Sequence, residues 1–299
     1  MRHDALAWHE SARVRKTTLA RGDSPSYTSP MLGGWAYAMA VVLAPTSSPY
    51  EVSWGEDAAA TAAALSVSAL LEAAVKPSLG QAPDCRHVVD GHCDAADLNA
   101  IDRTVVGNHS SAWGRVSDVG EISGIAVPLL AAAIDSYRHD GPRWSREAMA
   151  DTLVIAESLA VANLATTALK MAVRRPRPSQ YGPDEASPSV ERSVSFPSGH
   201  TTAAAAGSVA YAMTFALRYP ESSSRFAVFA AAAALTAMTG YGRVGAGMHF
   251  YSDVVAGAII GGAIGYLVPR WHRTRTPASP LVSAAPLGNG VGLQLVATF

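Results

Sequence analysis

Six long apolar segments, none with the alternating pattern of a half-buried strand, constrain the fold of this chain more than any other feature. They cover residues 57–75, 120–136, 150–172, 201–217, 226–242 and 253–268. Their length and their alanine and leucine content favour helices. Three of the segments are followed closely by a proline, which cannot continue a helix: Pro77, Pro176 and Pro269. We therefore predict an all-α fold built as a six-helix bundle.

The composition favours a membrane-spanning bundle. Hydrophobic residues make up 49% of the 299 residues and charged residues only 16%, against about 25% charged in a typical soluble domain. This apolar content excludes disorder for most of the chain. A net charge of -1 without a long basic run excludes nucleic acid as a partner. The alternative is an alanine-rich soluble bundle, because polar residues and a proline interrupt several segments, namely Glu72, Pro128, Asp135 and Glu157.

Three regions are expected along the chain: a lead of residues 1–50, a helical domain of residues 51–272 and a tail of residues 273–299. The lead is basic and then apolar over Met31–Ala44, a run too short to span a bilayer comfortably but suited to a signal-peptide core. The tail contains glycine and valine and is expected to be irregular or to form a short β segment.

The charges of the loops alternate along the chain. Two loops and both ends are basic, whereas the first long loop carries Asp84, Asp90, Asp94, Asp97 and Asp102. The positive-inside rule then predicts both ends in the cytoplasm and the long loops 77–119 and 173–199 on the periplasmic side of an inner membrane. A cleaved signal together with six spans would reverse this orientation, so one of the two interpretations is wrong. The alternative location is secretion to the periplasm.

The two cysteines, Cys85 and Cys93, lie in the first long loop. In an oxidising compartment their short separation favours a disulfide. His87 and His92 between them make a zinc site conceivable, although the spacing is not that of a zinc finger. The nearby aspartates could hold calcium, but without the register of an EF-hand. We expect no metal site.

Two clusters suited to phosphate lie at the ends of apolar segments. Lys170 and Arg177 are held at one helix end by a stiff segment with two prolines, and such cations bind phosphate as a point charge and a planar fork. Ser198, Gly199 and His200 open the next helix, whose free N–H groups can bind an anion. Taken alone, each is also typical of an ordinary helix end.

A third cluster contains Arg243, His249 and Asp253. If a helix begins near His249, Asp253 lies one turn away on the same face and can hold the imidazole in one tautomer. The other ring nitrogen is then free to attack. Alone, such a pair is more often a structural hydrogen bond, but the three clusters together predict an oxyanion site with a nucleophile and an acid.

Together, Lys-x6-Arg-Pro at 170–178, Pro-Ser-Gly-His at 197–200 and Arg-x5-His-x3-Asp at 243–253 resemble a known three-part signature. It is the signature of the type-2 phosphatidic acid phosphatase and vanadium haloperoxidase superfamily, and the resemblance covers about residues 57–270. The third motif of that superfamily usually begins Ser-Arg, whereas Gly242 precedes Arg243 here, which removes one hydroxyl contact to phosphate.

The resemblance implies a role for each matching residue. His249 would be the nucleophile that forms a phosphohistidine, oriented by Asp253, and His200 would protonate the leaving alcohol and then activate water. The phosphoryl oxygens would be held by Lys170, Arg177, Ser198, Gly199 and Arg243. The resemblance implies no cofactor, and an α-helical bundle as the core.

The resemblance leaves several functions open. The first is a phosphatase that acts on a phosphomonoester or pyrophosphate of a lipid, with the membrane as its location. The second is a soluble periplasmic acid phosphatase of broad specificity acting on small phosphoesters. Less favoured are a vanadium-dependent haloperoxidase, with vanadate bound by His249, and a transport or scaffold protein that retains an inactive site.

Overall fold

The computed structural model describes residues 48–79, 85–139, 143–182, 193–274, 281–287 and 290–296. The basic lead and the signal-like run Met31–Ala44 lie outside these residues, so the prediction of a signal stays a prediction.

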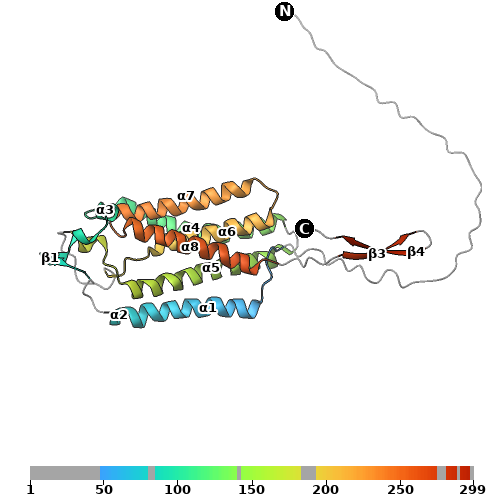
Figure 1. Cartoon of the computed structure of the whole chain (residues 1–299), viewed down its shortest axis with the longest axis horizontal. Coiled ribbons are helices and arrows are strands. Elements are labelled where there is room, and N and C mark those ends of the chain that lie inside the picture. Colours follow the sequence, from blue (N-terminus) through green and yellow to red (C-terminus); the bar gives the residue numbers. More distant parts are fainter. Residues whose placement is uncertain are drawn as a thin grey trace, which may run out of the picture. The chain divides into compact units, whose positions relative to one another are not determined.

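Six long helical stretches form the described core, and each covers one of the six predicted segments (Figure 1). They are α1 (Trp54–Leu70) with a π-helical turn (Leu71–Val75) and α2 (Lys76–Ser78), α4 (Ser111–His139), α5 (Trp144–Val173), α6 (Gly199–Arg218), α7 (Ser224–Gly245) and α8 (Tyr251–His272). The all-α prediction is confirmed. Pro128 and Pro269 lie inside α4 and α8, so Pro269 does not end its helix as the sequence suggested.

The remaining elements are short. The first long loop contains the hairpin of β1 (Val88–Val89) and β2 (His92–Cys93), a 3-10 turn (Ala95–Asp97) and α3 (Ala100–Arg103). A second 3-10 turn covers Pro178–Gln180. In the tail, β3 (Leu281–Leu287) pairs antiparallel with β4 (Gly290–Val296), as the prediction of a β segment allowed.

The helix α6 occupies the centre of the bundle, where it packs against α4, α5, α7 and α8. Its buried residues are mostly small, namely alanine, glycine, serine and threonine, which lets neighbouring backbones approach closely. On α8, a Cβ added to Gly261 would lie 2.2 Å from the carbonyl oxygen of Thr202, so only glycine fits there. Gly257 and Gly265 lie one turn before and after it on the same face, also against α6.

Within the residues that the structure describes, four helical stretches are long and apolar enough to cross a membrane: Trp54–Ser78, Ser111–Arg138, Trp144–Gln180 and Tyr251–His272. Their outer faces expose large apolar side chains, among them Leu70, Leu130 and Ile259. Large apolar side chains exposed along helices of this length suit contact with lipid. These features are those of a membrane protein with transmembrane helices, and they favour it over the soluble bundle.

Buried ion pairs tie the helices together where α6 and α8 end. Arg218 of α6 binds Asp151 of α5 at 2.6 Å, and both side chains are buried. His272 of α8 lies 2.9 Å from Glu157 of α5 and 3.7 Å from Asp57 of α1. The candidate site lies at the other end, where α6 and α8 begin.

Candidate active site

The three sequence motifs meet at one end of the bundle because successive helices run in opposite directions. The helix α5 ends beside Lys170 and α6 begins at Gly199, while α7 ends beside Arg243 and α8 begins at Tyr251. Two antiparallel pairs therefore bring their connecting loops, and the motifs in them, to the same end of the bundle.

His249 is held in one tautomer by a backbone carbonyl. Its side chain is buried, and Nδ1 lies 2.7 Å from the carbonyl oxygen of Ser195. A carbonyl oxygen only accepts, so Nδ1 carries the hydrogen and Nε2 keeps its lone pair. Burial lowers the pKa of His249 from 6.5 to about 3, so the ring is neutral near pH 7.

Asp253 acts on His249 less directly than the sequence suggested. Its Oδ2 lies 3.8 Å from Nδ1 of His249, beyond hydrogen-bond distance. The buried carboxylate instead accepts hydrogen bonds from Ser195 Oγ at 2.6 Å, Phe250 N at 2.9 Å and Arg175 Nη1 at 2.5 Å. Asp253 thus fixes Ser195, whose carbonyl oxygen orients the histidine.

Arg175 connects this group to the first long loop. Besides Asp253, its guanidinium donates to Oδ2 of Asp102 at 2.9 Å. Asp102 also accepts from N and Oγ of Ser252, at 3.1 and 2.5 Å. Burial opposes the charge of Asp102, but the hydrogen bonds from Ser252 and Arg175 outweigh it and hold the pKa below its usual value. The loop is therefore attached to the start of α8 next to the candidate nucleophile.

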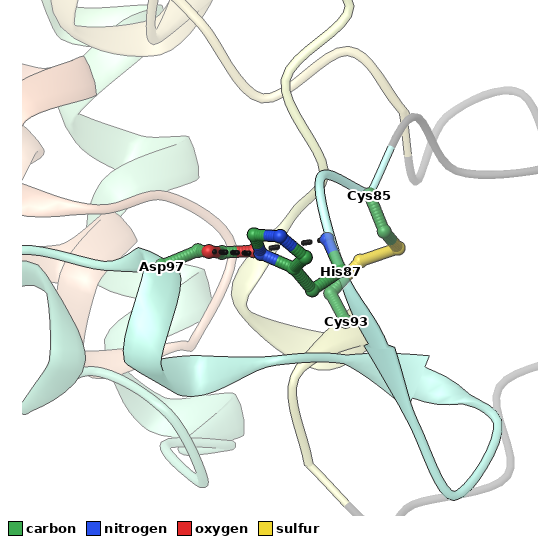
Figure 2. The surroundings of a disulfide bond; sticks show 4 residues. All are labelled: Cys85, His87, Cys93 and Asp97. Atoms are coloured by element: carbon green, nitrogen blue, oxygen red, sulfur yellow. Dashed lines mark hydrogen bonds and ion pairs between the residues drawn. A yellow bond between two sulfur atoms is a disulfide. The ribbon is translucent and has the colours of Figure 1, made fainter.

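A disulfide closes the same loop. Cys85 and Cys93 are joined across the β1–β2 hairpin, as Figure 2 shows. His87 points toward Asp97, with Nδ1 2.8 Å from Oδ1 and its backbone N–H donating to Oδ2. Because both cysteines form the disulfide, neither can bind zinc as a thiolate, and the pair does not support a zinc site.

His200 lies at the first turn of α6 between acidic and basic neighbours. Its Nε2 is 3.1 Å from Oδ1 of Asp118 and 3.1 Å from Oε2 of Glu121, both on α4, and 3.4 Å from Nη1 of Arg243. Burial, followed by the charge of Arg243, lowers the pKa of His200 from 6.5 to about 4. This ring is therefore also neutral near pH 7.

The three predicted cations lie around these histidines. Arg243 is buried, and burial together with the charge of Arg177 lowers its pKa to about 10. Arg177 Nη1 lies 3.6 Å from the sulfur of Met248, the residue before His249. A Cβ at Gly199 would lie 3.5 Å from Lys170 Nζ, an ordinary contact distance, so the ammonium lies beside the start of α6.

Ser198 is at the N-cap position of α6, as predicted, but its side chain makes no capping bond. Its Oγ pairs with Oγ1 of Thr201 at 3.0 Å. Its backbone N–H donates to the carbonyl oxygen of Asp253 at 3.1 Å, which links the second and third motifs.

The space at Gly242 is taken by another serine. A Cβ at Gly242 would lie 2.9 Å from both the Cβ of Ser117 and the carbonyl oxygen of Trp113, on α4. Ser117 Oγ is 3.4 Å from Nη1 of Arg243. The serine that the motif lacks at position 242 thus has a counterpart on α4, Ser117, which contacts the motif arginine.

The sequence analysis missed seven residues of this arrangement, namely Asp102, Ser117, Asp118, Glu121, Arg175, Ser195 and Ser252. Arg175 lies within the first motif, and Asp118 and Glu121 lie one helical turn apart at the beginning of an apolar segment. Two acidic residues on one face of an apolar helix are a signal that could have been used.

The family comparison agrees with the motifs. Residues 151–277 match the PAP2 superfamily, and this segment contains all three motifs. The resemblance to the type-2 phosphatidic acid phosphatase superfamily is thereby confirmed. No curated protein matches the chain.

A solved structure is also similar, the crystal structure of the first transmembrane PAP2 type phosphatidylglycerolphosphate phosphatase from Bacillus subtilis. It matches with a TM-score of 0.44 and 21% sequence identity, covering 72% of this chain and 94% of that chain.

Proposed function

We propose that this protein is a metal-independent membrane phosphatase that hydrolyses a phosphate ester of a lipid through a phosphohistidine. The observation that carries the proposal is the state of His249, neutral and bound through Nδ1 to a carbonyl, in the same cluster as His200 and Arg243. Neutral imidazole with a fixed tautomer is a nucleophile at Nε2. The match to the PAP2 superfamily supports phosphatase chemistry.

In the first step, Nε2 of His249 attacks phosphorus while the bond from phosphorus to the ester oxygen breaks. The leaving oxygen takes a proton from His200. Burial and the charge of Arg243 keep His200 neutral near pH 7, so it takes up this proton as substrate binds, when the phosphate dianion offsets the charge of Arg243. The carboxylate of Asp253, 3.8 Å from Nδ1, stabilises the positive charge that develops on His249.

In the second step, His200 accepts a proton from water, and the water oxygen attacks phosphorus. The N–P bond breaks, inorganic phosphate leaves, and Nε2 recovers its lone pair. Lys170, Arg177 and Arg243 neutralise the phosphoryl oxygens in both steps, with the N–H groups at the start of α6 beside Ser198 and Gly199. Charge neutralisation by these three cations is the part that a metal ion plays in other phosphatases.

We place the site on the periplasmic side of the inner membrane. The alternating loop charges support this orientation. The disulfide supports it as well, because it lies in the loop that Asp102 attaches to the site, and disulfides persist in oxidising compartments.

The test is phosphate release by the full chain in detergent micelles, without added metal and with a chelator present. The substrates are phosphatidate, undecaprenyl pyrophosphate and p-nitrophenyl phosphate, each with and without vanadate. We expect vanadate-sensitive release from a lipid, lowered at least about 10³-fold by His249→Ala. Release from p-nitrophenyl phosphate alone would instead favour the soluble-type acid phosphatase, and release that survives His249→Ala would contradict the mechanism.

A further inference from the structure

A pocket of about 240 Å³ opens beside His200, between the π-helical turn that extends α1 and the helices α4, α5 and α6. We call it the side pocket. Lys170 and His200 form one part of its wall, and Glu72, Glu121, Asn163 and Thr166 are among the residues that form the rest. His249, Arg177 and Arg243 do not line it.

This lining places the side pocket relative to the proposed reaction. In an in-line displacement, the attacking and leaving atoms lie on opposite sides of phosphorus. His249 would attack from one side, and His200 would protonate the leaving oxygen on the other. A pocket lined by His200 but not by His249 is therefore on the side of the leaving group.

The side pocket is polar although the helices around it are apolar. Glu72, Glu121 and Asn163 lie in stretches with the length and composition of membrane spans. Polar side chains at such positions are costly and usually serve a substrate or ion. Glu72 is paired with Lys76 at 2.7 Å, and Glu121 with His200 at 3.1 Å.

One hydroxyl in the wall points to a ligand. Thr166 is 4% exposed, and its Oγ1 has no hydrogen-bond partner among the described residues. Buried hydroxyls are nearly always hydrogen-bonded, so an unpartnered one beside a pocket needs a partner from outside the protein. A hydroxyl group of the substrate would supply it.

We propose, on the basis of the function proposed above, that the side pocket binds the leaving alcohol of a phosphomonoester, and that this alcohol is a polyol. Hydroxyl groups next to the ester can pair with Thr166, with the amide of Asn163 and with the carboxylates. A hydrocarbon chain directly after the ester oxygen would leave these groups unpaired. The second phosphate of a pyrophosphate would meet two carboxylates of the wall, Glu72 and Glu121, against the one ammonium of Lys170, so the wall disfavours it.

The test compares two soluble monoesters that differ only by hydroxyl groups, glycerol 3-phosphate and n-propyl phosphate. With the wild-type chain in micelles, we expect a kcat/KM at least about tenfold higher for glycerol 3-phosphate, because a site built to hydrogen-bond a hydroxyl disfavours an analogue without it. Thr166→Val and Asn163→Leu remove hydrogen-bonding groups at similar volume and should move this ratio toward one.

The control is Thr236→Val on α7, a threonine that bonds a carbonyl of its own helix outside the side pocket and should keep the ratio. Equal kcat/KM values for the two esters in the wild type, or a ratio unchanged in both pocket variants, would overturn the polyol assignment while leaving the phosphatase intact. If folded wild-type protein hydrolyses no monoester at all, both the proposed function and the polyol assignment are wrong.

Discussion

At the scale of single residues, the proposed mechanism depends on two histidines that are both neutral near pH 7. His249 is neutral because it is buried, and His200 because it is buried next to Arg243. In the proposed mechanism, a neutral His249 is ready to attack, whereas a neutral His200 first takes up a proton as the substrate binds. The two rings are chemically alike, and their neighbours assign the roles: a carbonyl oxygen for His249, and two carboxylates with an arginine for His200.

Both histidines make the folded protein sensitive to acid. Their pKa values of about 3 and about 4 lie below the usual 6.5, so between pH 6.5 and pH 4 the unfolded chain binds protons that the folded chain does not. Stability should therefore fall as the pH is lowered through this window. Thermal unfolding in micelles from pH 7.5 to 4 checks this. His249→Asn and His200→Asn should each flatten the dependence, and an unchanged slope in both variants would contradict the assigned pKa shifts.

At the scale of elements, close contacts between helices decide where the site residues lie. Gly242 lets α7 approach α4, and this approach brings Ser117 and Asp118 to Arg243. The contact also explains why the motif departs from the usual Ser-Arg. A side chain at position 242 of α7 would overlap with Ser117 of α4, so the packing does not allow both.

Restoring the usual motif residue should therefore harm the protein. In Gly242→Ser, the new Cβ would be 2.9 Å from a backbone oxygen of Trp113, which cannot rotate away. We expect a loss of about 1–3 kcal/mol in unfolding free energy, typical of overpacking, together with lower activity. The matched variant Gly262→Ser on α8 has open space around its Cβ and should cost less. Higher activity in Gly242→Ser would contradict this account.

The sequence predicted the helices better than it predicted the individual residues of the site. The apolar segments located all six long helices of the described bundle, because a predominantly apolar run of that length forms a helix wherever it is buried or in lipid. Lys170, His200 and His249 were found because each motif is contiguous in sequence. Asp118, Glu121 and Ser117 were missed because they reach the site from α4, and only the packing of α4 on α6 and α7 shows that.

At the scale of the whole molecule, the two ends of the described bundle differ: buried ion pairs join the helices at one end, and the candidate site lies at the other. Buried ion pairs such as Arg218–Asp151 hold the helices together at one end. At the other end, the charged groups surround the candidate site, and the loop with the Cys85–Cys93 disulfide is attached there through Asp102. Apolar outer faces between the two ends suit a membrane, from which a lipid substrate could reach the site laterally.

The central claim is the covalent intermediate on His249, and trapping it is the most direct measurement. The full chain in micelles would be mixed with excess phosphatidate, quenched in base within milliseconds to seconds, digested and examined by mass spectrometry, since phosphohistidine survives base but not acid. His200→Ala, which should slow hydrolysis of the intermediate, is the background of choice. We predict one added phosphoryl group on the peptide containing His249, absent in the His249→Ala, His200→Ala double variant. Turnover of phosphatidate with no label on His249 in this background, or with label on His200 in the wild-type chain, would contradict the account.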